Sequence, residues 1–376
     1  MMRDMNNTQR RVGIVTTNFA VNYGARLQEF ALMTAIHELG YDCAVLNYKP
    51  IAGLHGRGIT YSFESLQSSV NSILKIVNHS YRSALRRREA RFEEFDDLYI
   101  KLDPKVPVGL AELREAAERC DVLICGSDQI WNRNIFSDEV FYLPFGKAGE
   151  IQKVAYAPSI AEILSEHQYK EIAERVRGFK ALSVREEEAA CKLSNYVGRE
   201  VKTVVDPVFL LSEDHWRSMM TPVDVPQKYI LSYEIASDKR YGAILKALQA
   251  RTRLPIVNIN SRPYNKYNSE YVFTDLGPRQ FIWLLANAEH VCTSSFHATA
   301  FGLIFKRKMT VVANSRRSTR HETIMRRYRM HHRLITEDIA PEAAVADADV
   351  GFEERDSDMT NLIDEAYLFL RDALAG

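Results

Sequence analysis

The stretch Cys292-Thr293-Ser294-Ser295-Phe296-His297-Ala298-Thr299-Ala300-Phe301-Gly302 is the clearest guide to how this chain folds. An apolar run, His290 to Cys292, leads into small hydroxyl residues, and a helix-forming run follows His297. The order strand, short loop, helix is typical of an α/β protein with a parallel sheet, where ligands bind at the carboxyl ends of strands. The pattern predicts that His297 lies near a helix N-terminus at such a strand end.

A helix N-terminus is favourable for an anion because its first backbone N–H groups are unpaired and the helix dipole is positive there. An imidazole beside an anion site is a candidate general acid or base. The alternative is a Ser/Thr capping cluster followed by a packed histidine. This segment alone does not decide between the two.

The same alternation of short apolar runs and amphipathic stretches extends over the chain, as expected for βαβ units. At 376 residues the chain is long enough for two domains, and the proline-bearing stretch 221–228 is the best linker. We therefore predict an α/β fold of two Rossmann-like domains facing a cleft. The expected bounds are 1–220 for the N-terminal domain and 228–345 for the C-terminal domain, with a last helix, 357–376, packing back on the first domain.

The predicted strands and helices follow from this alternation. Strands are expected at Val12–Val15, Cys43–Leu46, Val122–Cys125, Val154–Ala157, Ala181–Val184, Val201–Val205, Tyr229–Tyr233, Ile256–Ile259, His290–Cys292 and Met309–Val312. Helices are expected at Gly24–Leu39, within 63–98, and at Gln168–Arg177, Glu186–Ser194, Asp238–Ala250, Pro278–Ala288 and Asp358–Leu374, with a loop at Ile51–Thr60.

The composition is that of an ordinary globular protein, with 46% hydrophobic and 26% charged residues and a formal net charge of zero. The charge gives no reason to expect a nucleic-acid partner. Five scattered cysteines without metal-ligand spacing argue against both a disulfide framework and a metal site, and favour a reducing cytoplasm. No run approaches the roughly 18 to 20 apolar residues of a membrane span, and the polar start is unlike a signal peptide.

One region carries a strong excess of positive charge. Its basic residues are Lys306, Arg307, Lys308, Arg316, Arg317, Arg320, Arg326, Arg327, Arg329 and Arg333, against the single acid Glu322. Such a block is more often a solvated face than a site. Its place just after the His297 helix favours an anion pocket.

Two polar loops follow predicted strands of the first half. The loop at 16–25 contains Asn22, Tyr23 and Gly24 but lacks the G-x-G-x-x-G pattern of dinucleotide binding. It could face a sugar or a phosphate, although Asn and Gly before a helix commonly serve as turn and cap residues. The loop after Cys125 offers hydrogen-bonding side chains and an indole for sugar binding: Ser127, Asp128, Gln129, Trp131 and Asn132.

The alternative for this second loop is a capped turn with Trp131 as a core anchor. Arg185 also follows a predicted strand, and its planar guanidinium suits a carboxylate or a phosphate. An ion pair of Arg185 with Asp206 or Glu186 is the equally simple structural alternative.

In this order, the segments resemble the polysaccharide pyruvyl transferase family. The matching segments are Asn22-Tyr23-Gly24-Ala25 with Leu27-Gln28, Gly126 to Asn132, Ser183-Val184-Arg185-Glu186, Asp206 to Leu211, and Ser295-Phe296-His297-Ala298. They extend over about residues 12 to 330. The resemblance implies a glycosyltransferase B-like fold and transfer of pyruvate from phosphoenolpyruvate, the co-substrate, to two hydroxyls of a sugar, with no further cofactor.

The resemblance also implies roles for the candidate residues. His297 corresponds to the active histidine and is expected to be the general acid. Phosphoenolpyruvate is expected at Arg185, Ser294, Ser295, Arg316, Arg317 and Arg320, and the acceptor at Asn22, Tyr23, Gly24, Ser127, Asp128, Gln129, Trp131 and Asn132. The resemblance implies that the acceptor is a glycan or a lipid-linked or nucleotide-linked sugar. Peripheral attachment of the protein to a membrane stays open, and so does its oligomeric state.

One position departs from the family pattern. Many members have an arginine two residues before the histidine, where this chain has Ser295. A donor-binding arginine could then come from elsewhere, or the donor could differ. Two other functions stay open: a nucleotide-sugar-dependent glycosyltransferase of the same fold, and a non-catalytic glycan-binding relative.

Overall fold

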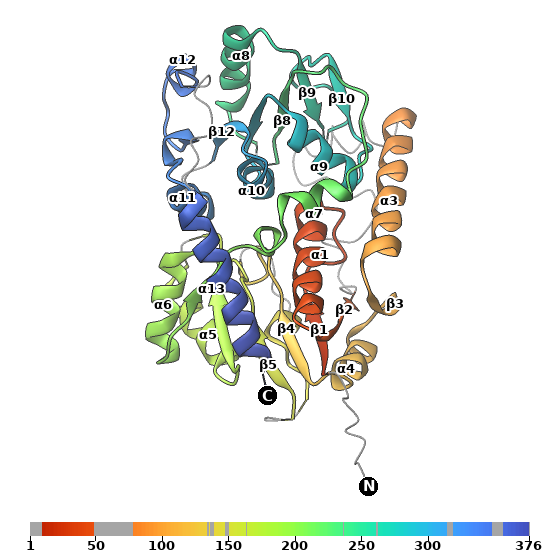
Figure 1. Ribbon diagram of the computed structural model, residues 1–376, viewed down its shortest axis with the longest axis vertical. Helices are drawn as coiled ribbons and strands as arrows, with labels where there is room; N and C mark the ends of the chain where they lie inside the picture. Colours follow the sequence, from red (N-terminus) through yellow and green to blue (C-terminus); the bar gives the residue numbers. More distant parts are fainter. Residues whose placement is uncertain are drawn as a thin grey trace.

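The computed structural model contains two parallel-sheet α/β domains, which confirms the predicted fold class (Figure 1). It describes residues 10–48, 78–133, 135, 139–146, 150–162, 164–235, 237–260, 262–313, 319–347 and 356–375. In Figure 1 the first domain, from red to light green, lies below the second, from teal to blue. The stretch predicted as a linker, 221–228, contains no helix or strand.

The first domain is built on a seven-stranded sheet with the order β3-β2-β1-β4-β5-β6-β7. Its strands are β1 (Arg11–Val15), β2 (Asp42–Tyr48), β3 (Leu102–Val108), β4 (Val122–Cys125), β5 (Gln152–Ala155), β6 (Ala181–Val184) and β7 (Lys202–Thr203). Its helices are α1 (Tyr23–Glu38), α3 (His79–Tyr99), α4 (Leu110–Glu118), α5 (Glu166–Val176), α6 (Glu187–Val197) and α7 (Glu213–Ser218), with the 3-10 turns η1 (Glu139–Tyr142) and η2 (Pro207–Phe209).

The second domain has a six-stranded sheet with the order β10-β9-β8-β11-β12-β13. Its strands are β8 (Ile230–Tyr233), β9 (Ile256–Ile259), β10 (Tyr271–Phe273), β11 (His290–Thr293), β12 (Lys308–Val312) and β13 (Leu334–Ile335). Its helices are α8 (Tyr241–Thr252), α9 (Pro278–Asn287), α10 (Phe296–Ile304), α11 (Thr319–Arg327) and α12 (Pro341–Ala344), with the 3-10 turn η4 (His331–Arg333), and the chain ends in α13 (Asp356–Leu374).

Strand order places the ligand-binding edge of each sheet. Every strand pair is parallel, and the order reverses direction between β1 and β4 in the first sheet and between β8 and β11 in the second. Ligands of open α/β sheets bind outside the carboxyl ends of strands at such a switch point. The loops after β1, β4 and β11, which carry most of the predicted site residues, therefore lie where the fold favours a site.

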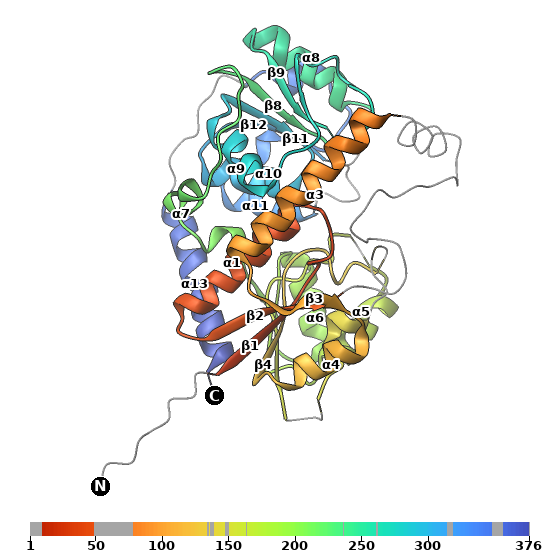
Figure 2. The same ribbon diagram turned by 90° about the vertical axis from the view of Figure 1, so that its right-hand side faces the viewer.

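Aromatic packing joins the two domains on one side. Tyr23, at the start of α1, stacks on Phe281 of α9 with ring centroids 4.4 Å apart, and its hydroxyl donates to the carbonyl of Leu276 at 3.1 Å. Helix α3 reaches along both domains (Figure 2), and its Arg87 pairs with Asp275 at 2.9 Å. The contacts bury a continuous apolar cluster across the interface.

Helix α13 returns to the first domain, alongside which it runs in Figure 1. Carbonyls at and just after its C-terminus accept hydrogen bonds from three side chains of that domain: Arg10, Gln152 and Lys180. Two of these donors are cations, which are favourable at a helix C-terminus because the dipole is negative there. Tyr367 of α13 also donates to Glu38 at 2.9 Å.

The sequence patterns missed strands β3, β10 and β13 and helices α4, α7, α11 and α12, of which β3 and α11 show the reasons most clearly. Strand β3 contains Pro104 and Pro107 and two charged residues, so it lacks the apolar alternation of a half-buried strand. Proline is tolerated there because β3 is an edge strand. Helix α11 lies inside the basic block and buries only His321, Ile324 and Met325. The sequence of this helix therefore shows its positive charge clearly but gives little sign that it is helical.

Part of the predicted secondary structure lies outside the described residues, namely the loop at 51–60 and residues 63–77. In the described part of the chain, no helix combines the length and apolarity needed to cross a membrane.

Candidate functional site

The predicted histidine lies where the two domains meet. His297 is in the first turn of α10, which Ser295 caps by accepting from the backbone N–H of Ala298 at 3.3 Å. Its ring lies against Gly24, in the first turn of α1: a Cβ built on Gly24 would be 2.0 Å from Nδ1. The contact joins the two switch points, and only glycine leaves room for the ring.

The buried carboxylate of Asp206 faces the other edge of the same ring. Asp206 precedes η2, and its Oδ2 lies 3.6 Å from Nε2 of His297. The same oxygen accepts a hydrogen bond from Nη1 of Arg185 and one from Oγ of Ser127 at 3.3 Å. Burial by itself would raise the pKa of Asp206, but the Arg185 guanidinium and His297 hold that pKa well below its usual range.

Arg185 lies directly after β6 and is 4% exposed. Besides Asp206, its Nη2 lies 3.8 Å from Oδ1 of Asp128, and its guanidinium stacks over the ring of Phe296 at 4.7 Å. Its Nε and Nη2 have no hydrogen-bond partner among the described residues. The Arg185–Asp206 ion pair, given above as the structural alternative, is present, and two nitrogens of the guanidinium still have N–H groups to offer a ligand.

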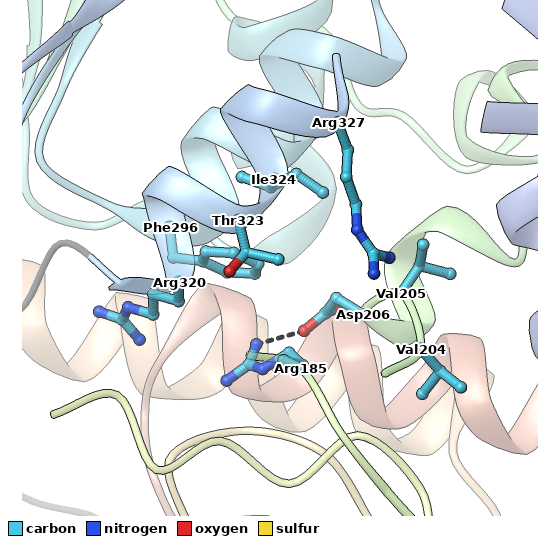
Figure 3. Close-up of a pocket in the computed structure, with 9 residues that line it drawn as sticks. All are labelled: Arg185, Val204, Val205, Asp206, Phe296, Arg320, Thr323, Ile324 and Arg327. Carbon is cyan, nitrogen blue, oxygen red and sulfur yellow. Dashed lines mark hydrogen bonds and ion pairs between the residues drawn. The ribbon is translucent and has the colours of Figure 1, made fainter. Parts of the chain in front are cut away.

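A pocket opens beside this cluster, with a volume of about 260 Å³ when the space open to solvent is counted (Figure 3). It is bordered by loop residues of the first domain and by α10 and α11 of the second. The lining residues are Arg185, Val204, Val205, Asp206, Phe296, Arg320, Thr323, Ile324 and Arg327. The lining contains three guanidiniums and one carboxylate, so it carries an excess of positive charge.

The three arginines differ in how far their charge is compensated. Arg185 pairs with Asp206, and Arg327 pairs with Glu187 at 3.1 Å. Arg320 stacks over Phe296 at 5.6 Å, and its buried Nε has no hydrogen-bond partner among the residues that the structure describes. Burial, and then the like charge of Arg185, lower the pKa of Arg320 to about 10. A bound anion would offset both effects.

The pKa of Asp206 leads to a prediction for stability at low pH. We expect the wild-type protein to lose stability more steeply than Asp206→Asn as the pH falls below about 4. The folded-state pKa of Asp206 lies below the unfolded value, so its contribution is complete above the unfolded pKa and is lost toward the folded one. Urea midpoints between about pH 3 and pH 6 measure this. Parallel curves for the two proteins would contradict it.

The other described residues that were predicted to bind the donor, Ser294 and Ser295, do not line the pocket. Ser295 uses its hydroxyl to cap α10, and Ser294 accepts from the backbone N–H of Ile235 at 3.0 Å. Arg316 and Arg317 lie outside the described residues. The structure thus brings Arg185 and Arg320 together with His297, and their roles toward a donor remain predictions.

The predicted acceptor residues divide into a buried and a half-buried group. Tyr23, Ser127, Trp131 and Asn132 are each at most 1% exposed. Trp131 donates to the carbonyl of Phe141 at 3.3 Å and stacks on Tyr142, so it leaves no ring face for a sugar. Trp131 is therefore a core anchor in this structure, which is the structural alternative given for this loop.

Asn22, Asp128 and Gln129 are half-buried. Asn22 caps α1 by accepting from the backbone N–H of Gly24 at 2.9 Å. Asp128 has a φ of +80° and accepts from Thr17 Oγ1 at 3.2 Å, so its carboxylate is held in a conformation that is costly for a residue with a side chain. Their binding of an acceptor stays a prediction.

Sequence reasoning missed several residues of the pocket. Asp206 entered only as an ion-pair partner and as part of the Asp-Pro segment, and Phe296 only as a neighbour of His297. Arg327 and Thr323 are separated from Arg320 by seven and three positions on α11, which places them on one helix face. A helical reading of the basic block would have found that face.

No group of three or more His, Cys, Asp or Glu side chains in the described ranges is arranged to hold a metal ion.

Comparison with known proteins gives one family and one fold. A family model described as polysaccharide pyruvyl transferase matches residues 22–316, and no curated protein matches the chain. The UDP-GlcNAc 2-epimerase of Methanocaldococcus jannaschii is 11% identical, with 92% of this chain and 93% of that chain covered and a TM-score of 0.52. The proposed UDP-N-acetylglucosamine 2-epimerase of Listeria monocytogenes is 11% identical, with 98% and 92% covered and a TM-score of 0.52. Such low identities show the fold alone, which is glycosyltransferase B-like.

Proposed function

Because the chain belongs to the polysaccharide pyruvyl transferase family, we propose that it moves pyruvate from phosphoenolpyruvate onto two hydroxyls of a glycan sugar. The product is a cyclic ketal, and inorganic phosphate leaves. The acceptor is a cell-surface polysaccharide or its lipid-linked or nucleotide-linked precursor. A cytoplasmic location, which the cysteine pattern favours, is part of the same proposal.

One observation carries the proposal: His297 lies beside a pocket lined by Arg185 and Arg320, and Nε of Arg320 has no hydrogen-bond partner in the described part of the chain. The donor is an anion with a carboxylate and a phosphate, and guanidiniums bind both groups in a planar, bidentate way. Positioning and fixed positive charge would supply much of the catalysis.

The reaction needs one proton at the start. His297 donates a proton to the terminal enol carbon of phosphoenolpyruvate, which becomes a methyl group and leaves an oxocarbenium-like centre. One sugar hydroxyl adds to that centre, and its proton returns to His297. Phosphate then leaves, and the second hydroxyl closes the ketal while its proton goes to the departing phosphate. General acid–base catalysis of this kind contributes about 10²- to 10⁴-fold to a rate.

The test is incubation of the protein with phosphoenolpyruvate and a panel of glycan acceptors. Phosphate release together with a ketal-bearing sugar, identified by mass and by NMR, is the expected result. Consumption of UDP or GDP sugars without ketal formation would instead support the glycosyltransferase alternative. Binding of glycans without any turnover would support a non-catalytic relative.

Arg320→Gln is expected to weaken phosphoenolpyruvate binding by about 10- to 100-fold, because a hydrogen bond to a charged group contributes about 1.5 to 3 kcal/mol. The same change should leave stability equal or higher, since Nε of Arg320 is buried and has no hydrogen-bond partner within the described ranges. Isothermal titration and thermal unfolding measure the two effects.

Arg326→Gln is the matched control for this variant. Arg326 is exposed on the same helix and does not line the pocket. An unchanged affinity in Arg320→Gln, or an equal loss in Arg326→Gln, would count against a donor role for Arg320.

A further inference from the structure

We propose that Asp206 is a positioning residue that fixes His297 relative to the donor-binding Arg185, an inference that rests on the proposed pyruvyl transfer. Asp206 need not touch the reacting atoms for this role. It acts by holding two groups, one from each domain, with a single carboxylate oxygen.

The geometry of that oxygen is the first step. Oδ2 of Asp206 faces Nη1 of Arg185, Nε2 of His297 at 3.6 Å and Oγ of Ser127 at 3.3 Å. The other oxygen, Oδ1, accepts from the backbone N–H of Val208 at 3.1 Å. Both oxygens are therefore held, and the side chain is fully buried. A carboxylate fixed in this way has one orientation available.

A chain of hydrogen bonds carries this orientation back to the centre of the first sheet. Gln28 of α1 donates to Oγ1 of Thr16 at 3.1 Å, and Thr16 donates to the carbonyl of Ser127 at 3.0 Å. The single hydroxyl proton of Ser127 is shared between Oδ2 of Asp206 and the carbonyl oxygen of Ala157, which lies 2.9 Å away. All three side chains are buried, so Ser127 is a support for Asp206 in this structure rather than a surface for an acceptor.

Charge separates a positioning role from a simple counter-ion role. Asp206 is the carboxylate that lines a pocket otherwise charged by Arg185, Arg320 and Arg327. Replacing it with a neutral amide makes the pocket more positive, so an anionic donor should bind as well as before or more tightly. If Asp206 were only a counter-ion, its replacement would change donor affinity and leave the rate of the bound complex unchanged. Replacing a positioning residue lowers that rate, because the histidine ring loses the carboxylate that faces its Nε2 at the ion-pair distance of 3.6 Å.

The experiment compares Asp206→Asn with Asp96→Asn. Asp96 is also buried and also pairs with a buried arginine, Arg26 at 2.7 Å, but it does not line the pocket. Phosphoenolpyruvate affinity by titration and kcat for phosphate release are measured for each. We expect kcat of Asp206→Asn to fall by roughly 10²-fold. Its dissociation constant for phosphoenolpyruvate should be unchanged or lower, and Asp96→Asn should keep both values.

An unchanged kcat in Asp206→Asn overturns the positioning role, and so does an equal loss in Asp96→Asn. If Asp206→Asn does not fold, Ser127→Ala takes its place. It removes the hydroxyl whose proton Oδ2 shares with the Ala157 carbonyl, and no charge, so a fall of about threefold to tenfold in kcat at constant donor affinity supports the role. Unchanged turnover in Ser127→Ala overturns it.

A second readout does not need turnover and keeps this inference separate from the proposed function. With ¹³C-labelled histidine, the His297 resonance is identified by its absence in His297→Ala. It should shift in Asp206→Asn and stay in place in Asp96→Asn. If the wild-type protein transfers no pyruvate, the proposed function fails, and this shift alone decides whether Asp206 orients the ring. An unmoved resonance in Asp206→Asn overturns that orientation.

Discussion

Pyruvyl transfer by His297→Ala is expected to be about 10³-fold slower than by the wild-type protein, because the enol carbon then lacks its proton donor. The ring is enclosed by Gly24 on one edge and Asp206 on the other and is only 7% exposed. A water molecule would have to replace a proton donor that these contacts hold in place. The affinity for phosphoenolpyruvate should stay within a few fold, since the guanidiniums carry the positive charge of the pocket.

His290→Ala is the matched control. His290 is 1% exposed and belongs to the same strand–loop–helix unit, but it lies at the amino end of β11, where Nε2 contacts Oγ1 of Thr310 at 3.0 Å. It should lose stability and keep its turnover. Single-turnover kinetics with phosphoenolpyruvate measure the chemical step directly. A loss of less than about tenfold in His297→Ala would exclude it as the general acid.

The fold was predictable because parallel sheets of this kind leave a regular signal. Buried strands such as Val122–Cys125 and Ile256–Ile259 are short apolar runs between amphipathic helices, and the structure has strands with these bounds. The placement of His297 followed from the same regularity, since a helix that succeeds a strand begins at the carboxyl edge of the sheet.

The exposure of individual side chains was not predictable in the same way. Trp131 follows a strand end, where an indole could stack on a sugar, yet it packs against Tyr142 inside the first domain. Tyr23 likewise stacks on Phe281 of the other domain. Sequence position gives the edge of the sheet on which a residue lies, but the partner that buries it comes from a distant segment or another domain.

The relation between Asp206 and His297 shows the same limit more sharply. They are far apart in the sequence, belong to different domains and meet at one carboxylate oxygen. Local sequence patterns indicated each residue separately, Asp206 in an Asp-Pro turn and His297 at the start of a helix. Their contact depends on the packing of the domains, about which neither local pattern carries information.

Gly24→Ala should lower pyruvyl transfer by at least about 10²-fold, because a Cβ at this position would lie 2.0 Å from Nδ1 of His297 and 2.3 Å from Cγ. No real Cβ tolerates such a contact, so the ring must move away from its place between Gly24 and Asp206. Gly242→Ala is the matched control. Like Gly24, Gly242 is the second residue of a helix, α8, and lies in the sequence Tyr-Gly-Ala. Its Cβ would lie 3.2 Å from Tyr267, which a small shift relieves, so Gly242→Ala should keep turnover.

Stability measurements on a double-mutant cycle identify the clash as the cause. Alanine in a helix is favoured over glycine by roughly 0.5 to 1 kcal/mol, so Gly24→Ala should stabilise the protein once His297 is replaced by alanine. In the wild-type background the clash opposes that gain, and the same substitution should be destabilising. The expected result is thus a change of sign between the two backgrounds, measured as the free energy of unfolding in urea. Equal effects in both backgrounds would mean that the ring does not occupy the space above Gly24.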